Sequence, residues 1–264
     1  MRQGIPELRA FYASPLGRAA REMVARKITE AWGGCAGLDV LALGYATPFI
    51  GDLAAEARRA IAVMPAAQGV ESWPFHERNR ACLADEMALP LPNAMLDRIL
   101  AVHALEESDG PLGLLREAAR VLAPAGRMII VVAARHGPWA HGESSPFGHG
   151  RSYSRIQLEA VVREAGLEPI GWTRALYAPP LNWAARWAGT FEQAGALAWA
   201  PFAGLVLLEA AKQTFAIRPK GRTARAAPRG VFQPVPAANA RSSWPRPENA
   251  PTLVRPLSRE GRDP

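Results

Sequence analysis

The order of apolar and turn-forming segments within residues 83–132 constrains the fold of this 264-residue chain more than any other feature. A short acidic turn leads into the apolar run 96–102, and an amphipathic segment then begins at Pro111. A Pro/Ala/Gly break separates that segment from a second apolar run at 128–133. Apolar runs of this length are typical of strands buried on both faces, and the amphipathic segment is typical of a helix. The segment therefore predicts a strand–helix–strand unit.

The same alternation continues on both sides of this unit. Ser14 followed by Pro15 is a strong helix start, and Ser154 with Gln157 forms a capping-box pattern that starts another helix. Alternating strands and helices predict a doubly wound α/β fold with a mostly parallel sheet. The other expected elements are a helix at 14–32, a strand at 38–43, a helix at 52–59, a strand at 60–63, an irregular stretch at 64–80, and, after the capping box, a strand at 168–177, a helix at 181–197 and a strand at 203–217.

The positive charge of the chain lies at one end. The net charge is +7, but residues 218–264 carry ten Arg and Lys against three acidic residues, whereas residues 1–217 carry 21 of each sign. We therefore expect residues 1–217 to form one domain, with the N-terminal helix 14–32 preceding a core at 38–217. Because the domain is neutral, nucleic acid is not its expected partner.

The basic C-terminal segment is expected to be a disordered tail. It holds nine of the 24 prolines and few apolar clusters, so it cannot bury enough surface to offset the entropy lost on ordering. One interpretation is a solvated appendage, and another is weak contact with RNA, DNA or anionic lipid. The lack of a basic segment interleaved with aromatic residues favours the solvated appendage.

The two cysteines and the N-terminus indicate a cytoplasmic protein. Cys35 and Cys82 are far apart and lack metal-ligand spacing, which fits small buried residues in a reducing compartment. The first residues contain no apolar stretch typical of a signal peptide. The longest apolar stretch, residues 194–208, is shorter than a bilayer requires and is interrupted by Pro201, so we expect no transmembrane segment.

Three short segments that follow expected strands resemble one family. Residues 42–48 read ALGYATP, residues 84–90 read ADEMALP, and residues 102–107 read VHALEE. In this order, the chain from about 38 to 215 resembles a class I S-adenosylmethionine (SAM)-dependent methyltransferase, of the small-molecule type also called methyltransferase type 11. The resemblance implies a Rossmann-like fold of that class, SAM as cofactor, and a small-molecule or lipid-like methyl acceptor.

The first of these segments departs from the family pattern. The family usually carries an acidic residue and three alternating glycines here, and this chain retains only Gly44. Ala42 stands at the acidic position, and Ala46 and Pro48 replace the second and third glycines. Proline removes a backbone N–H and fixes φ near −65°, so this turn cannot form as it does in the family. The resemblance still implies cofactor contacts from Gly44, Tyr45 and Ala46.

A second departure lies after the next strand. The family usually has an acidic residue there, which binds both ribose hydroxyls of the cofactor, and this chain has Met64. Each lost charged hydrogen bond costs about 1.5–3 kcal/mol, and about 1.4 kcal/mol corresponds to tenfold in affinity. Glu71 is the candidate for compensating this loss.

The adenine side of the pattern is retained. By the resemblance, Asp85 accepts a hydrogen bond from the adenine amino group, and Glu86 and Met87 flank the ring. The alternative for Asp85 is a turn residue whose carboxylate caps the backbone of Met87 or Ala88. Both interpretations are compatible with the sequence.

Two aromatic positions complete the expected cofactor site. Tyr12 stands in a segment similar to the aromatic lead-in of several of these enzymes, where an aromatic side chain covers the cofactor. Packing in the core is the alternative. His103 follows the strand 96–102, so it is a candidate for cofactor contact or for a catalytic base. A histidine that is hydrogen-bonded at a strand end is equally compatible.

Methyl transfer needs a base only where the acceptor must lose a proton, so a missing base does not exclude catalysis. The catalytic candidates are His103, His149 and Tyr153, with Arg151 as a further polar group of the same loop. The triplet around His149 is alternatively a tight turn. Because the histidines lack metal-ligand spacing, no metal site is expected.

Two functional hypotheses follow from these patterns. The first is a SAM-dependent methyltransferase that acts on a small or lipid-like acceptor. The alternative is a catalytically inactive protein of the same fold that serves as a binding or regulatory subunit. The Trp-rich segment 183–199 is expected to pack on the core, and a hydrophobic substrate or a protein partner is the alternative role.

Overall fold

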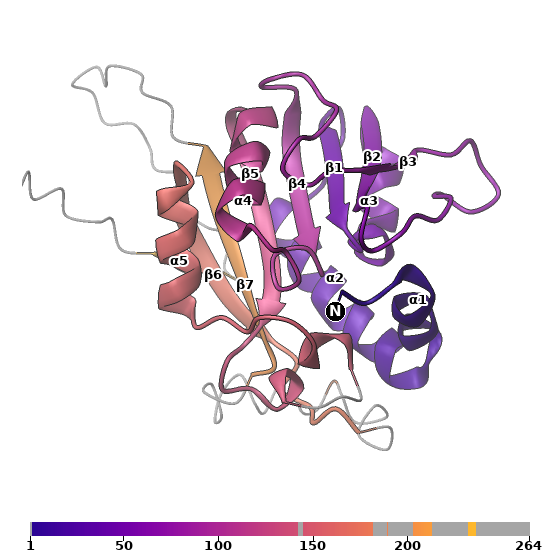
Figure 1. The fold of residues 1–264 in the computed structure, drawn as a ribbon, viewed down its shortest axis with the longest axis vertical. Coiled ribbons are helices and arrows are strands. Elements are labelled where there is room, and N and C mark those ends of the chain that lie inside the picture. The colour runs from indigo at the N-terminus through magenta and orange to yellow at the C-terminus, as the bar shows by residue number, and fades with distance from the viewer. Residues whose placement is uncertain (1, 142–144, 182–188, 190–202, 213–231, 236–264) are drawn as a thin grey trace, which may run out of the picture.

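The computed structural model describes residues 2–141, 145–181, 189, 203–212 and 232–235 (Figure 1). Within these residues, one sheet has the strand order β3-β2-β1-β4-β5-β7-β6-β8. The strands are β1 (Asp39–Gly44), β2 (Arg59–Pro65), β3 (Ala81–Ala84), β4 (Leu96–Val102), β5 (Leu122–Ala133), β6 (Leu167–Ala175), β7 (Leu205–Lys212) and β8 (Gln233–Pro234). The helices are α1 (Ile5–Ala13), α2 (Pro15–Trp32), α3 (Gly51–Glu56), α4 (Pro111–Val121) and α5 (Arg155–Glu164), with 3-10 turns η1 (Thr47–Phe49), η2 (Pro138–Ala140) and η3 (Pro146–Gly148).

The sheet is doubly wound and mostly parallel, as the sequence predicts. Strands β3, β2, β1, β4 and β5 are parallel neighbours, and β7 runs antiparallel between β5 and β6. The order reverses at β1, which pairs with both β2 and β4. Ligands of such sheets bind outside the carboxyl ends of the strands near this reversal. This edge is where a functional site is expected.

Helices cover both faces of the sheet, which explains the nearly continuous apolar strands. In β1, Val40 and Ala42 belong to the core under α1, α2 and α3, whereas Leu41 and Leu43 belong to the core under α4 and α5. Figure 1 shows α4 and α5 in front of the strands and α2 behind them. Alternate residues of each strand therefore enter different cores.

The helix starts that were read from the sequence are confirmed. The Ser14 hydroxyl accepts a hydrogen bond from Gly17 N at the start of α2, and Gly33 ends the helix with φ 70°. At the start of α5, Ser154 and Gln157 form both hydrogen bonds of the capping box. Each cap satisfies backbone groups that a helix end leaves unpaired.

Several boundaries differ from the prediction. Strand β5 begins at Leu122 and runs through the expected break at Pro124, while Ala125 adopts φ 62°. A register shift between Leu96 and Arg98 accompanies this extension, and irregular pairing is where strands tolerate proline. Helix α3 is shorter than expected, and strand β3 was not predicted. Nor was α1, which buries only Ile5, Leu8 and Tyr12.

Part of the expected tail is ordered. Phe232 and Val235 are buried, and β8 pairs with Gly171 and Trp172 of β6. The prediction of a disordered segment at 218–264 is therefore wrong for residues 232–235, because two apolar side chains there bury against the sheet edge. The remainder of that segment lies outside the described residues. The expected helix at 181–197 also lies outside them, apart from Leu181 and Gly189. No helix in the described part of the chain is long and apolar enough to cross a membrane.

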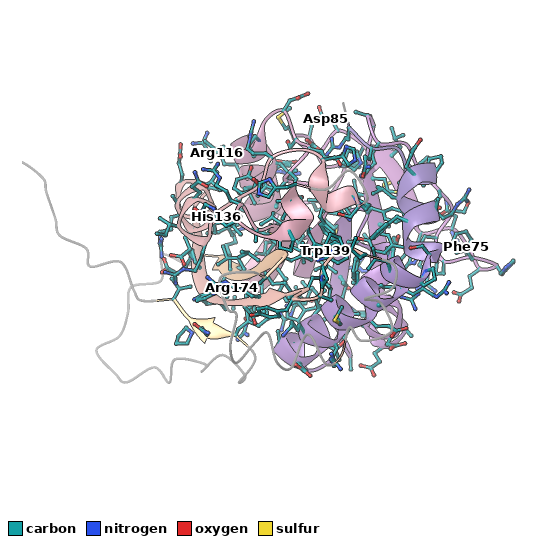
Figure 2. All side chains as sticks on the ribbon, turned by 90° about the horizontal axis from the view of Figure 1, so that it is seen from below. Phe75, Asp85, Arg116, His136, Trp139 and Arg174 are labelled. Carbon is teal, nitrogen blue, oxygen red and sulfur yellow. The ribbon has the colours of Figure 1, made fainter. Side chains whose placement is uncertain are left out.

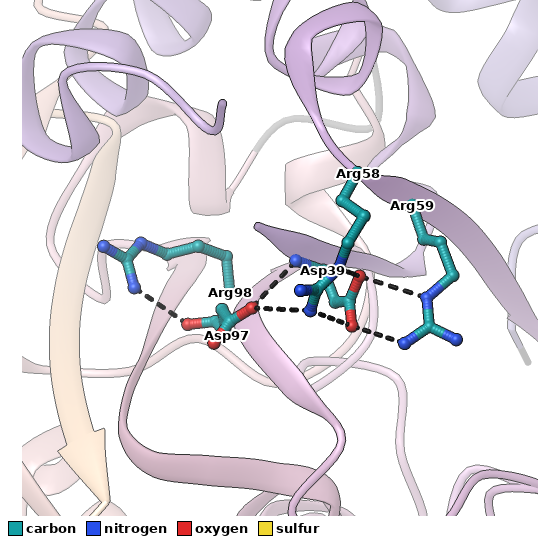
Figure 3. Close-up of polar contacts among 5 residues, drawn as sticks. All are labelled: Asp39, Arg58, Arg59, Asp97 and Arg98. Carbon is teal, nitrogen blue, oxygen red and sulfur yellow. Dashed lines mark hydrogen bonds and ion pairs between the residues drawn. The ribbon is translucent and has the colours of Figure 1, made fainter. Parts of the chain in front are cut away.

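A charged cluster closes the opposite, amino edge of the sheet (Figure 3). The carboxylate of Asp39 is 1% exposed and accepts two hydrogen bonds each from Arg58 and Arg59, at 2.6–3.1 Å. Asp97 accepts a hydrogen bond from the Asp39 backbone at 2.9 Å. The hydrogen bonds from Arg58 and then Arg59 hold the pKa of Asp39 well below its ordinary value. The cluster joins the first residues of β1 and β2 to β4.

We predict that Asp39→Asn lowers the free energy of unfolding at neutral pH, because it removes the charge that both guanidinium groups bind. A lowered pKa contributes stability above the ordinary value of 3.8, and this contribution is lost as the pH falls below it. The difference between wild type and variant should therefore shrink below that pH. Urea denaturation across the acid range measures it, with exposed Asp52→Asn as the control. A difference that is independent of pH would contradict the assignment.

Candidate functional site

Most residues that the resemblance assigns to the cofactor lie together at the carboxyl edge of the sheet. Tyr45 follows β1, Met64 is near the end of β2, and His103 follows β4. Figure 1 shows the N-terminal residues and α1 beside the carboxyl ends of these strands. Tyr45, Met64 and His103 are 3%, 0% and 1% exposed. The chain's own N-terminal residues therefore cover much of this edge.

Gly44 provides close contact between two strand ends. It adopts φ +75°, and a Cβ atom added there would lie 2.4 Å from Val102 O. The next residue, Tyr45, donates its N–H to the same carbonyl at 2.9 Å. Ala46 is buried, and η1 then begins at Thr47. The retained glycine therefore serves the packing of β1 against β4, and a 3-10 turn replaces the glycine-rich turn of the family.

Tyr12 is the centre of an aromatic cluster at this edge. Its hydroxyl group lies 2.6 Å from His103 Nε2, and its ring stacks on Tyr45 with a centroid distance of 5.9 Å. Phe49 meets the same ring edge-on at 5.3 Å. The structure thus shows the packing role for Tyr12. Contact of Tyr12 with a cofactor stays a prediction.

His103 is held as a neutral, hydrogen-bonded residue. Burial lowers its pKa to about 3, so the imidazole is uncharged at neutral pH. Its backbone has φ 50°, and its carbonyl accepts a hydrogen bond from Gln68 Nε2 at 3.2 Å. The ring also lies 4.5 Å from that of Phe147. Of the three interpretations for His103, the hydrogen-bonded residue at a strand end is the one seen in the structure.

The turn after β3 lies at the rim of the molecule. Asp85 Oδ1 accepts a hydrogen bond from Met87 N at 2.8 Å, so the turn-capping interpretation is observed. Asp85 and Met87 are exposed, and Figure 2 places Asp85 at the periphery, away from Trp139. Glu86 points inward and forms an ion pair with Arg2 at 2.6 Å. Adenine contacts of Asp85, Glu86 and Met87 stay predictions.

Glu71 reaches the end of β2, where the family carries its acidic residue. Its backbone N–H lies 3.5 Å from Met64 Sδ, and burial followed by the Glu71 carboxylate raises the pKa of Tyr45. The oxygen Glu71 Oε2 is buried and has no hydrogen-bond partner among the described residues, although Arg9 lies 3.8 Å away. Glu71, Tyr45 and Tyr12 line a cavity of about 380 Å³, which we call the Glu71 cavity.

A second cavity of about 620 Å³ lies beside Glu106, and we call it the Glu106 cavity. Sequence reasoning did not single out Glu106, although an acidic residue just after a buried strand is a usable signal. Both Glu106 side-chain oxygens are buried without a hydrogen-bond partner among the described residues, and burial raises the pKa of this carboxyl to about 8.

The catalytic candidates of the loop before α5 differ in their exposure to solvent. Tyr153 is buried and its N–H donates to Ala133 O at 3.0 Å, which places it at the carboxyl end of β5. His149 is half-buried and ends η3. Arg151 is exposed, and its N–H donates to Glu106 O at 2.7 Å. In the described part of the chain, no three His, Cys, Asp or Glu residues are grouped so that they could hold a metal ion.

Residues 42–130 match the family described as a methyltransferase domain. This segment is similar to methyltransferase domains. It contains the loop after β1, the turn after β3 and the strand–helix–strand unit of β4, α4 and β5.

A curated relative of this chain is the 27-O-demethylrifamycin SV methyltransferase of Amycolatopsis mediterranei. It is 37% identical over 93 residues, which are 33% of this chain and 34% of that protein. The match therefore spans about a third of the length of the relative.

Solved methyltransferases share the fold. A SAM-dependent methyltransferase from Thermotoga maritima, described as a possible histamine N-methyltransferase, has a TM-score of 0.55 at 18% identity. The superposition covers 79% of this chain and 96% of that one. Geranyl diphosphate C-methyltransferase from Streptomyces coelicolor has a TM-score of 0.53 at 13% identity, over 72% of this chain and 77% of that one.

We predict that Tyr12→Phe lowers the free energy of unfolding by about 1–2 kcal/mol, because it leaves a buried histidine nitrogen without its partner. Tyr153→Phe is the matched control, since it removes a buried hydroxyl group that has no hydrogen-bond partner among the described residues. Denaturant titration of both variants measures the difference. Equal losses would contradict a specific Tyr12–His103 hydrogen bond.

Proposed function

We propose that this protein is a SAM-dependent methyltransferase that acts on a small or lipid-like acceptor. The observation that carries the proposal is the position of Glu71. It supplies a buried carboxylate oxygen at the end of β2 that has no hydrogen-bond partner among the described residues, in the lining of a cavity that also borders the loop after β1. The methyltransferase family supports a cofactor of the SAM type. The family match does not favour the inactive alternative.

The residues of the carboxyl edge fit the chemistry of this cofactor. A ribose presents two adjacent hydroxyl donors, and the Glu71 carboxylate is a hydrogen-bond acceptor. Tyr12 and Tyr45 offer ring faces on the same cavity, and aromatic faces attract cations such as a sulfonium. We assign cofactor contacts to Glu71, Tyr12 and Tyr45, with Asp85 on the adenine side. When bound, the cofactor supplies an electrophilic methyl group.

The chain's own residues then have to position the acceptor and exclude water. The buried rings of Tyr12, Phe49 and Phe147 form an apolar wall at the carboxyl edge. Excluding water there favours methyl transfer to the acceptor over hydrolysis of the methyl donor. Holding the acceptor in line with the methyl group is the main contribution to the rate. His103, with its lowered pKa, serves as a hydrogen-bonding residue of this wall.

The identity of the acceptor is proposed only as a class. The Amycolatopsis relative is a methyltransferase of a demethylated rifamycin, and the Streptomyces structure contains geranyl diphosphate and S-adenosyl-L-homocysteine (SAH). Both names are compatible with a small or lipid-like acceptor here. A structural relative from Haloferax volcanii was solved with a methyltransferase activator, and a protein partner through residues 183–199 stays a prediction, since that segment lies outside the described residues apart from Gly189. The cytoplasmic location also stays a prediction.

We predict that Glu71→Gln weakens SAH binding at least tenfold, because it removes the charged acceptor for the ribose hydroxyls. Isothermal titration calorimetry of SAH with the full chain measures this. Glu77→Gln is the control, since Glu77 is exposed in the same loop and pairs with Arg80. Folded protein that gives no binding heat with either SAM or SAH would contradict the proposed function.

We predict that Asp85→Ala also weakens SAH binding, and that this loss disappears with S-inosylhomocysteine, which lacks the adenine amino group. The comparison separates the adenine contact from the turn, because a distorted turn would weaken both ligands alike. Asp85→Asn serves as the control, since its side-chain oxygen can still accept the Met87 N–H. Equal losses with the two ligands would assign Asp85 to the turn alone.

A further inference from the structure

Glu106 is a buried carboxyl group that follows β4 and lines the Glu106 cavity. It is 4% exposed, and neither oxygen has a hydrogen-bond partner of ordinary geometry among the described residues. Burial raises its pKa to about 8, and the backbone groups of Glu106 and Ala104 offset this only in part. An unsatisfied buried polar group destabilises the folded state, and a buried charge does so more, so its retention points to a ligand.

The neighbouring charged groups are partly engaged or exposed. Glu107 accepts a hydrogen bond from Gln3 N at 2.9 Å, and Arg2 forms its short ion pair with Glu86. Asp109 is exposed to solvent. Among the described residues, both carboxylate oxygens of Glu106 lack a hydrogen-bond partner, whereas Glu107 of the same cavity has one such oxygen.

Tyr153 is a second unsatisfied group, in the loop whose residues Gly150 and Arg151 line the Glu106 cavity. Its hydroxyl is buried and has no hydrogen-bond partner among the described residues. Burial raises the pKa of Tyr153, the Arg151 guanidinium lowers it in part, and the Glu106 carboxylate raises it again. The loop that precedes Tyr153 packs directly against the backbone of Glu106, since a Cβ atom on Gly150 would lie 2.7 Å from Glu106 O. The Glu106 carboxylate, a hydrogen-bond acceptor that lines the cavity, is thus close enough to the Tyr153 hydroxyl, a hydrogen-bond donor, to raise its pKa.

The two groups together select for a hydroxyl. A hydroxyl group donates one hydrogen bond and accepts others, so it can satisfy the carboxylate and the phenol at once. An ammonium group only donates and would leave the Tyr153 hydroxyl without an acceptor. A cavity of about 620 Å³ has the size of ordinary small-molecule sites.

We propose that the Glu106 cavity binds a hydroxyl-bearing methyl acceptor and that Glu106 is the base that takes the hydroxyl proton. This inference rests on the proposed function, because a methyl sulfonium donor must supply the methyl group. The O–H bond breaks and its proton moves to the Glu106 carboxylate. The oxygen electron pair forms the O–CH₃ bond while the carbon–sulfur bond of the donor breaks, leaving a neutral thioether and a methyl ether.

The Glu106 cavity lies close to the expected cofactor site. Glu106 follows His103 by three residues at the end of β4, and Tyr12, which borders the Glu71 cavity, has its pKa raised by burial and then by Glu106. The titratable groups that face Glu106 are Glu107, Arg2, Tyr12 and Tyr153. A base between the Glu106 cavity and the Glu71 cavity is in a position to contact an acceptor that approaches the methyl group.

Carbon-13 NMR of side-chain carboxyls in glutamate-labelled full chain tests the proposal, with phenol and its methyl ether anisole as probes. We expect one carboxyl that titrates near pH 8 in the wild type and is missing in Glu106→Gln. Phenol should lower its titration midpoint, because the donated hydrogen bond favours the charged form, whereas anisole should not. Glu209→Gln is the matched control, since Glu209 is another buried carboxyl with a raised pKa but is paired with Arg127.

Ether formation from phenol, followed with a methyl-labelled donor, should fall roughly 100-fold in Glu106→Gln, with SAH affinity unchanged. A high-pH carboxyl that persists in Glu106→Gln, or equal shifts with phenol and anisole, would overturn the role of Glu106. So would wild-type ether formation in the variant. Failure of SAH to bind would instead overturn the proposed function, because the probe titration does not depend on the cofactor.

Discussion

The close contact between the ends of β1 and β4 is the constraint on which the candidate site depends. At Gly44 there is no room for a Cβ atom, because Val102 O would lie 2.4 Å from it. The Tyr45 N–H donates to that same carbonyl, so the chain turns directly over the end of β4. This contact brings Tyr45 and His103 to the position where the strand order reverses. Any residue larger than glycine would separate the two strand ends and disperse the aromatic cluster.

The sequence predicted the fold where periodicity is long and unambiguous. The run 96–102 coincides with β4, and Pro111 starts α4, because apolar spacing and helix-start residues agree there. Helix α1 escaped prediction because nine residues with three buried positions give little periodic signal, and tertiary contacts hold it in place. The extension of β5 through Pro124 was not predicted because it also depends on tertiary contacts. Pairing with β4 overrides the local preference of Pro124 for a break.

The site was only partly predictable because its important contacts are not local. The segment after β3 was recognised as a turn from its own residues, and Asp85 caps it. Glu71, by contrast, follows Met64 by seven residues along an irregular path, so the sequence could not establish that it returns to the end of β2. The Arg2–Glu86 pair joins residues 84 positions apart, and no sequence spacing reports it. Glu106 could have been predicted as a site residue, since the sequence places it just after a buried strand.

The protonation state of Glu106 depends on neighbouring side chains that are uncharged. Burial keeps His103 uncharged, with its pKa at about 3, so it offers no cation to the carboxylate, and the raised pKa of Tyr12 keeps that phenol neutral. Arg2 is the nearby cation, but its strongest pairing is with Glu86. A Glu106 carboxylate paired with a free arginine would titrate too low to accept a proton from a hydroxyl. Arg2 still lowers the pKa of Glu106 in part, but burial outweighs it, so Glu106 stays basic enough for proton transfer near neutral pH.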